Sequence, residues 1–164
     1  MRGKGIVILT ALLCCLLAGC RRNQPLDTIV QVSYSSNAGP ILPELQWYEE
    51  ITITPDAVLL TRSGRVAETE INTGSWQLTV DPAAVSALFE HLAAVDCTTI
   101  TRLEPDDPLD GGETESYRVV YASGAACSLR YDPGTTYANG MQIVQPVRMF
   151  LAGLDFPANS GRYR

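Results

Sequence analysis

The chain has almost no lysine and almost no histidine. Lys4 is the only lysine and His91 the only histidine among 164 residues, and acidic residues outnumber basic residues 18 to 12. A nucleic-acid-binding domain needs a basic patch to meet phosphate groups, so we expect no nucleic-acid partner. The common catalytic motifs are missing as well, among them Gly-x-Ser-x-Gly, His-Glu-x-x-His and the phosphate-binding Gly-x-x-x-x-Gly-Lys. We therefore expect a protein that is not an enzyme and that needs no cofactor.

The sequence also lacks an apolar run long enough to cross a membrane. The stretch Ile6 to Ala18 has 13 uncharged, mostly apolar residues, which as a helix reach about 20 Å against a hydrocarbon core of roughly 30 Å. Arg2 and Lys4 precede it and form a positively charged beginning. This combination predicts a signal peptide over residues 1–19 that is removed from the mature chain.

The residues after this stretch point to a lipid anchor. The segment Leu17 to Cys20, with the sequence Leu-Ala-Gly-Cys, resembles the lipobox of bacterial lipoproteins. The resemblance implies cleavage before Cys20 and acyl chains, palmitate among them, that hold the protein on a membrane. It also implies the outer membrane in a Gram-negative cell, because Arg21 follows the cysteine, and otherwise the outer face of the plasma membrane. The alternative is an ordinary secretory signal that happens to contain a cysteine.

Removal of the signal changes the charge and the domain boundaries. The first 19 residues carry two of the 12 basic residues, so the remaining 145 residues have ten basic residues against 18 acids and a net charge of −8. We expect the lipidated Cys20 to begin a short tether over residues 20–27. A single domain should span residues 28–156, and a flexible tail residues 157–164.

Two cysteines remain in the predicted exported domain, Cys97 and Cys127. An even pair in an oxidising compartment favours a disulfide bond. The bond would contribute about 3.5 to 4 kcal/mol on a chain-entropy estimate. A redox or nucleophilic thiol is the alternative, although no Cys-x-x-Cys spacing is present.

The hydrophobic periodicity predicts an α+β domain with one antiparallel meander sheet of about five to six strands. Apolar residues at helical spacing indicate one amphipathic helix at about 82–95, packed on a face of the sheet and capped by Asp81. A second helix at about 143–154 carries Pro146 in its first turn. The expected strands lie at 28–34, 51–53, 58–60, 76–80, 117–121 and 127–131, with loops at 35–43 and 132–142.

The order of sheet and helix over roughly Glu49 to Leu154 is similar to that of bacterial emfourin-type protease-inhibitor domains. The resemblance concerns the architecture and implies no role for any single residue. As a function it implies inhibition of an exported enzyme.

Six acids crowd into residues 104–115, and Asp106, Asp107 and Asp110 are candidate Ca²⁺ ligands. Compared with an EF-hand loop, the segment has Pro108 at the third position and Tyr117 at the twelfth, where oxygen ligands are required. A solvated acidic loop is the alternative reading. His91 falls beside the apolar stripe of its predicted helix and is expected at the surface rather than in catalysis.

Two further places are candidates for binding. The loop at 132–142 contains Tyr137 and Asn139, which suit adaptable recognition and equally suit a structural connection. Arg118 and Arg130 fall on one face of neighbouring predicted strands, where they would hold an anion or pair with acidic residues.

These observations leave two classes of function open. The first is an envelope lipoprotein whose acidic domain binds another envelope protein, as an assembly factor or an inhibitor. The second is a carboxylate-based hydrolase, or a module that binds Ca²⁺ or another small ligand.

Overall fold

A computed structural model describes residues 27–38, 46–64, 73–107, 109 and 111–157 of the chain. The predicted signal peptide, Cys20 with nearly all of its tether, Asp110, and the tail beyond Pro157 lie outside the described residues. The strands and helices, in chain order, are β1 Ile29–Asn37, β2 Trp47–Ile53, β3 Val58–Gly64, β4 Gly74–Leu78, α2 Pro82–Ala93, the short 3₁₀ helix η2 Cys97–Thr99, β5 Thr101–Leu103, β6 Thr114–Tyr121, β7 Ala126–Tyr131, β8 Thr136–Ala138 and α3 Met141–Ala152.

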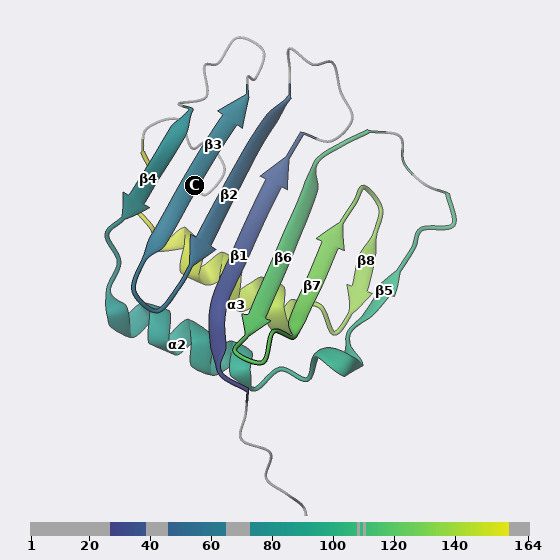
Figure 1. The fold of residues 1–164 in the computed structure, drawn as a ribbon. Helices are drawn as coiled ribbons and strands as arrows, with labels where there is room; N and C mark the ends of the chain where they lie inside the picture. Colours follow the sequence, from purple (N-terminus) through teal and green to yellow (C-terminus); the bar gives the residue numbers. More distant parts are fainter. Residues whose placement is uncertain (1–26, 39–45, 65–72, 108, 110, 158–164) are drawn as a thin grey trace, which may run out of the picture.

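Six strands form one antiparallel sheet in the order β4-β3-β2-β1-β6-β7. Strands β1 to β4 follow one another as a meander, and the chain then returns through α2 so that β6 pairs with the free side of β1. Both helices lie on the same face of this sheet, and the small β5–β8 pair lies beside β7 (Figure 1). The predicted α+β architecture is confirmed.

Strand β1 is longer than predicted. A loop was expected from Ser35, but the ladders to β2 and β6 both continue to Asn37. Ser36 is completely buried, and its hydroxyl donates to a Glu113 carboxylate oxygen at 2.5 Å. The loop prediction was wrong here because two neighbouring strands satisfy the backbone of polar residues that alone favour turns.

Helix α2 begins as predicted and ends earlier than predicted. The Asp81 side chain accepts a hydrogen bond from the amide of Ala83, and a proline follows in the first turn. The helix ends at Ala93, two residues before the predicted 95. The apolar stripe that predicted it is buried, and its residues are Val85, Leu88 and Leu92.

Helix α3 begins at Met141 rather than near residue 143, so Pro146 lies in its second turn and not in its first. The start is fixed by Gly140, where a Cβ atom would lie 2.6 Å from the Tyr131 hydroxyl and 2.6 Å from the Tyr137 Cβ. Only glycine fits this close approach. The short strand β8 and the beginning of α3 therefore occupy a segment that was predicted to be entirely loop.

The core lies between the sheet and the helix layer. Its fully buried members come from all layers: Val32, Ile51, Ile53, Val58, Leu60, Leu92, Tyr117, Val119, Leu129, Ile143, Val147 and Leu151. No helix in the described part of the chain has the length and apolar character to span a membrane. The other face of the sheet is mainly polar, with serines and threonines alternating with the core residues, although Leu59 is exposed on it.

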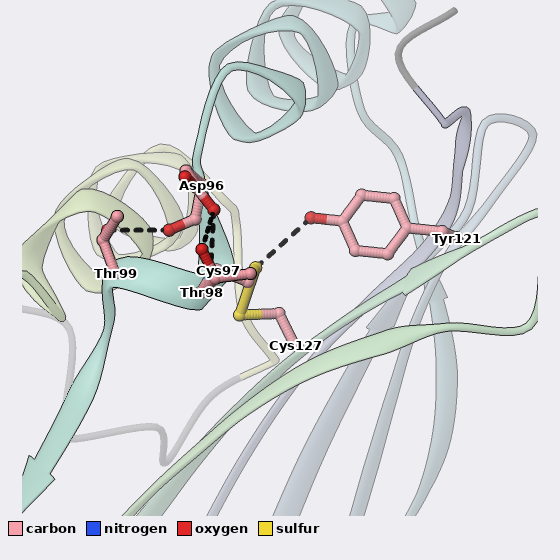
Figure 2. The surroundings of a disulfide bond; sticks show 6 residues. All are labelled: Asp96, Cys97, Thr98, Thr99, Tyr121 and Cys127. Carbon is pink, nitrogen blue, oxygen red and sulfur yellow. Dashed lines mark hydrogen bonds between the residues drawn. A yellow bond between two sulfur atoms is a disulfide. The ribbon is translucent and has the colours of Figure 1, made fainter. Parts of the chain in front are cut away.

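The predicted disulfide bond joins Cys97 on η2 to Cys127 on β7, with 5.9 Å between the two Cα atoms (Figure 2). The Cys97 sulfur also lies 3.5 Å from the Tyr121 hydroxyl on β6. η2 is capped by Asp96, whose side chain accepts from the Thr98 amide at 3.0 Å. The bond thus ties the return from α2 to the outermost strand of the sheet.

Candidate functional site

A groove with a volume of about 680 Å³ lies between α2 and α3. It runs along both helices, from Ala84 to Val95 on one side and from Met141 to Phe150 on the other. Most of the residues that form it are exposed and lie beside the stripes that face the sheet, whereas Leu88 belongs to the buried stripe of α2. The groove is therefore a seam on the helix layer that solvent reaches.

The groove exists because α2 carries alanine on the side that faces α3. Ala84, Ala87 and Ala94 recur at three- and seven-residue spacing, which places them on one side of the helix. Their methyl groups fill little of the space between the two helices. The floor of the groove is consequently apolar and shallow.

The wall on α3 is built from longer, flexible side chains. Met141, Gln145 and Met149 follow one another at four-residue spacing and line the groove. Met149 is 68% exposed and Met141 is 56% exposed, which is a high exposure for large apolar side chains. Methionine adapts its shape to different apolar partners, so this wall is suited to contact another molecule.

Acidic residues flank the groove. Asp81 precedes α2, Glu90 lies on it, Asp96 follows it and Asp155 follows α3. Side-chain and backbone hydrogen bonds from Thr98 lower the pKa of Asp96 below its ordinary value, so its charge is maintained at neutral pH. The two helices and their ends therefore carry four acids against one arginine, Arg148.

The one arginine on α3 points away from this groove. Arg148 donates from Nε to the Tyr117 hydroxyl at 2.9 Å and from Nη2 to a Glu115 carboxylate oxygen at 2.5 Å. Burial, followed by the charge of Glu115, raises the pKa of Tyr117 far above 10. Arg148 is thus occupied within the protein, over β6.

His91 is exposed, as predicted, and it lines the groove on the α2 side. Within the described ranges, no three His, Cys, Asp or Glu residues come close enough together to hold a metal ion. Asp106 and Asp107 are exposed in a bend after β5, and the third Ca²⁺ candidate, Asp110, lies outside those ranges. The groove offers mainly apolar contact.

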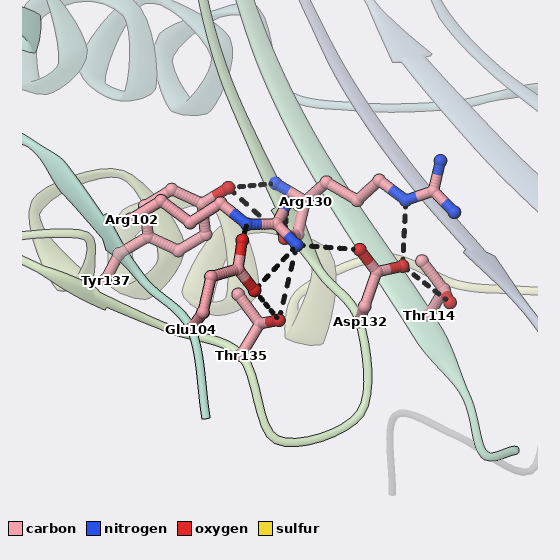
Figure 3. Close-up of polar contacts among 7 residues, drawn as sticks. All are labelled: Arg102, Glu104, Thr114, Arg130, Asp132, Thr135 and Tyr137. Atoms are coloured by element: carbon pink, nitrogen blue, oxygen red, sulfur yellow. Dashed lines mark hydrogen bonds and ion pairs between the residues drawn. The ribbon is translucent and has the colours of Figure 1, made fainter. Parts of the chain in front are cut away.

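Two of the predicted recognition residues, Arg130 and Tyr137, belong to a network of polar contacts among residues of β5, β6, β7, β8 and the segments next to them (Figure 3). Arg102 donates to Glu104 at 2.5 Å, to Asp132 at 3.0 Å and to the backbone oxygen of Arg130 at 3.2 Å. Arg130 in turn donates from Nε to Asp132 at 2.9 Å. Arg130 therefore pairs with an acidic residue two positions along its own chain, rather than across neighbouring strands as the sequence had suggested.

Tyr137 holds β8 against β7. Its hydroxyl accepts the backbone N–H of Arg130 at 2.9 Å and donates to the backbone oxygen of the same residue at 3.2 Å. Asn139 has a left-handed backbone, with φ of 60°, and its side-chain amide donates to the Thr99 oxygen at 3.1 Å. Both candidate recognition residues thus make contacts that shape the protein itself.

Arg118 lies on the polar face of the sheet, opposite the helices. It is exposed on β6, between Ser33 of β1 and Ser128 of β7 in the register. The alternation of the two strands places it on the same face as Arg130. Because Arg130 is bound to Asp132, the predicted pair does not present two free guanidinium groups to an anion.

The groove was not anticipated from the sequence. The signal was present in the alanines of α2 and in the methionines and Gln145 of α3, all at helical spacing beside the core stripe. The hydrophobic periodicity of a helix predicts which residues face the core. It gives no information on how two helices lie next to each other.

Comparison with known proteins adds no assignment to this site. No protein-family model matches the chain, and no curated protein matches it.

Proposed function

We propose that this chain is a bacterial envelope lipoprotein, anchored through Cys20, whose acidic domain binds another protein through the α2–α3 groove and performs no catalysis. The observation that carries the proposal is the groove itself, an open apolar surface walled by exposed methionines. Patches of this kind on a soluble domain mark interaction sites.

The lipid anchor follows from the sequence resemblance and fits this role. Only six residues lie between Cys20 and Asp27, where the described structure begins. A tether of that length extends at most about 25 Å. An anchored domain would therefore meet its partner close to the membrane surface.

A small apolar ligand is the second candidate for the groove. Its volume of about 680 Å³ falls within the roughly 300 to 1,000 Å³ of small-molecule sites. Such sites bury most of their ligand, however, whereas this groove is open to solvent, as the high exposure of Met149 in its wall shows. A protein partner is therefore favoured.

Site-specific photo-crosslinking in the producing cell tests the proposal. A photoreactive phenylalanine analogue replaces Met149 in the groove or, as the matched control, Thr61 on the polar face of the sheet. We expect a discrete adduct of higher mass from position 149 and none from position 61. Adducts of equal yield at both positions, or none at 149, would contradict the proposal.

The anchor has its own test. Cys20→Ala should leave the precursor uncleaved and unlabelled by radioactive palmitate. Normal processing of that variant would show that the signal is an ordinary secretory one.

A further inference from the structure

The groove has the length of a short helix. α2 and α3 have 12 residues each, which at 1.5 Å per residue gives about 18 Å, or just over three turns. The groove is lined along nearly this whole length on both sides. An extended peptide would need only five or six residues to cover it, and the seam between two helices suits a third helix that packs along them.

The lining matches the apolar side of such a helix. An amphipathic helix that lies in a groove inserts residues at i, i+3, i+4 and i+7. The small side chains of Ala84, Ala87 and Ala94 allow the close approach that this packing needs, and Met149 covers the inserted residues from the side. Gln142 and Gln145, which also line the groove, supply polar groups that can hydrogen-bond the partner.

The charges on the two helices and at their ends favour a partner of positive charge. Among the described residues of α2, α3 and their flanks, the four acids Asp81, Glu90, Asp96 and Asp155 have no ion pair, and the single arginine is bound to Glu115. Glu90 lies three residues after Ala87 and four before Ala94, so it is adjacent to the floor of the groove. A partner with lysine or arginine beside its apolar stripe gains attraction there, and an acidic partner is repelled.

We infer that the occupant of the groove is a basic amphipathic helix of about three turns, supplied by a partner protein. The inference rests on the proposed function and specifies its partner by chemistry: an apolar stripe for the alanine floor, flanked by lysine or arginine for the acidic surroundings.

The test uses the full mature chain with its lipid, reconstituted into nanodiscs of neutral phosphatidylcholine. Three hydrocarbon-stapled helical peptides of 14 residues serve as probes. The first has a leucine stripe flanked by lysines, the second the same stripe flanked by glutamates, and the third the lysine composition with its stripe scrambled. Binding is measured by fluorescence anisotropy, with empty nanodiscs as the blank. We expect the lysine peptide to bind about tenfold more tightly than either of the others, with a preference that salt reduces.

Substitutions then locate the binding. Ala87→Gln fills the floor of the groove without changing its charge and should abolish binding of the lysine peptide. Ser86→Gln, an exposed position next to it on a different side of α2, is the matched control and should leave binding unchanged. Glu90→Gln should lower the affinity for the lysine peptide severalfold and should not lower the affinity for the glutamate peptide. Thermal melting of each variant shows that the fold is retained.

The outcomes separate the inference from the proposed function. Equal affinity of the lysine and glutamate peptides, with both weakened by Ala87→Gln, would overturn the basic partner while the groove remains a binding site. Equal binding of the scrambled peptide would show that net charge alone explains the binding. It would overturn the inference that the occupant is an amphipathic helix. A failure of every peptide also overturns the inference. The proposed function itself then stands or falls with the adduct at position 149.

Discussion

The two edges of the six-stranded sheet, β7 and β4, are stabilised in different ways. On the β7 side, the Tyr137 hydroxyl binds both backbone groups of Arg130, and a disulfide bond ties the strand to η2. On the β4 side, the strand pairs only with β3 in the described structure. On the neighbouring strands β3 and β2, Arg62 and Glu49 form a buried ion pair at 2.5 Å, and Trp76 and Phe156 lie near the guanidinium group.

The difference shows how burial changes the value of the same chemistry. The side chains of Arg62 and Glu49 are 2% and 6% exposed, whereas those of Arg130 and Asp132 are 66% and 32% exposed. An exposed ion pair contributes at most about 1 kcal/mol, because water and salt screen it. A buried pair adds little net stability when intact, but removal of one partner leaves an uncompensated charge in the core.

The largest expected effect is therefore on the β4 side. Arg62→Met leaves the Glu49 carboxylate buried without its cation and should lower the free energy of unfolding by about 3 to 5 kcal/mol, measured by urea denaturation. Arg130→Met removes an exposed partner and should change it by less than about 1 kcal/mol.

The double substitution Arg62→Met with Glu49→Leu is the control. It removes both charges together and should recover much of the lost stability. A single Arg62→Met variant as stable as the unmodified protein would show that the pair is not buried in solution.

The disulfide bond ranks next, on the β7 side. Replacement of both Cys97 and Cys127 by serine releases a loop with a sequence separation of 30, for which the chain-entropy estimate is about 3.5 kcal/mol. The midpoint of urea denaturation should fall accordingly, and reductant should have the same effect on the unmodified chain and none on the variant. Melting of the unmodified chain that is insensitive to reductant would contradict this.

The alternation of apolar residues was enough to predict most strands and both helices, because each core stripe repeats with its own period. Val85, Leu88 and Leu92 are buried as their spacing predicted. The three-residue strands β5 and β8 were missed because they are too short to show a period. The place of β6 next to β1 depends on contacts between segments far apart in the sequence.

The site was less predictable than the fold. Glu49 alternates with Ile51 and Ile53 and is buried with them. From its charge alone, Glu49 would be expected at the surface. The roles of Tyr137 and Asn139 depend on backbone groups that the sequence does not place beside them. The groove results from the relative position of two helices, which the spacing of residues within each helix does not specify.

A smaller effect is expected at the closed β7 edge. Tyr137→Phe removes only the hydroxyl that binds the Arg130 backbone, and should cost about 1 kcal/mol. The sharper measurement is amide hydrogen exchange by NMR. The Arg130 amide should exchange faster in the variant and approach the outward amides of β4, while the amides between β6 and β7 stay protected. Unchanged exchange at Arg130 would show that the hydroxyl does not protect this edge.

The smallest effect concerns pH at the same edge. Burial raises the pKa of Asp132, but hydrogen bonds from Arg102 and Arg130 outweigh it, so its pKa is lowered below 3.8. A lowered pKa stabilises the folded state above the unfolded value of about 3.9, and this contribution disappears as the pH falls through the folded value. Asp132→Asn should therefore lose less stability than the unmodified chain between neutral and acidic pH.

Thermal melting at pH 7 and at about pH 3 measures this difference, and low pH is the range in which a lowered carboxylate pKa loses its effect. Asp107→Asn is the matched control, because Asp107 is exposed and outside the network. An identical loss in the Asp132 and Asp107 variants would show that the network has no effect on acid stability.

Strand β1 comes first in the sheet along the chain and also lies at its centre. Its pairs with β6 run from Ile29 with Tyr121 to Asn37 with Thr114. One edge of β1 therefore cannot pair with β6 until most of the chain has been synthesised. Pairing over such a separation is slow, in the range of milliseconds to seconds for β-rich domains. Arrival of β6 should therefore be the late step of folding, and until then the cell must keep the exposed side of β1 from pairing with other chains.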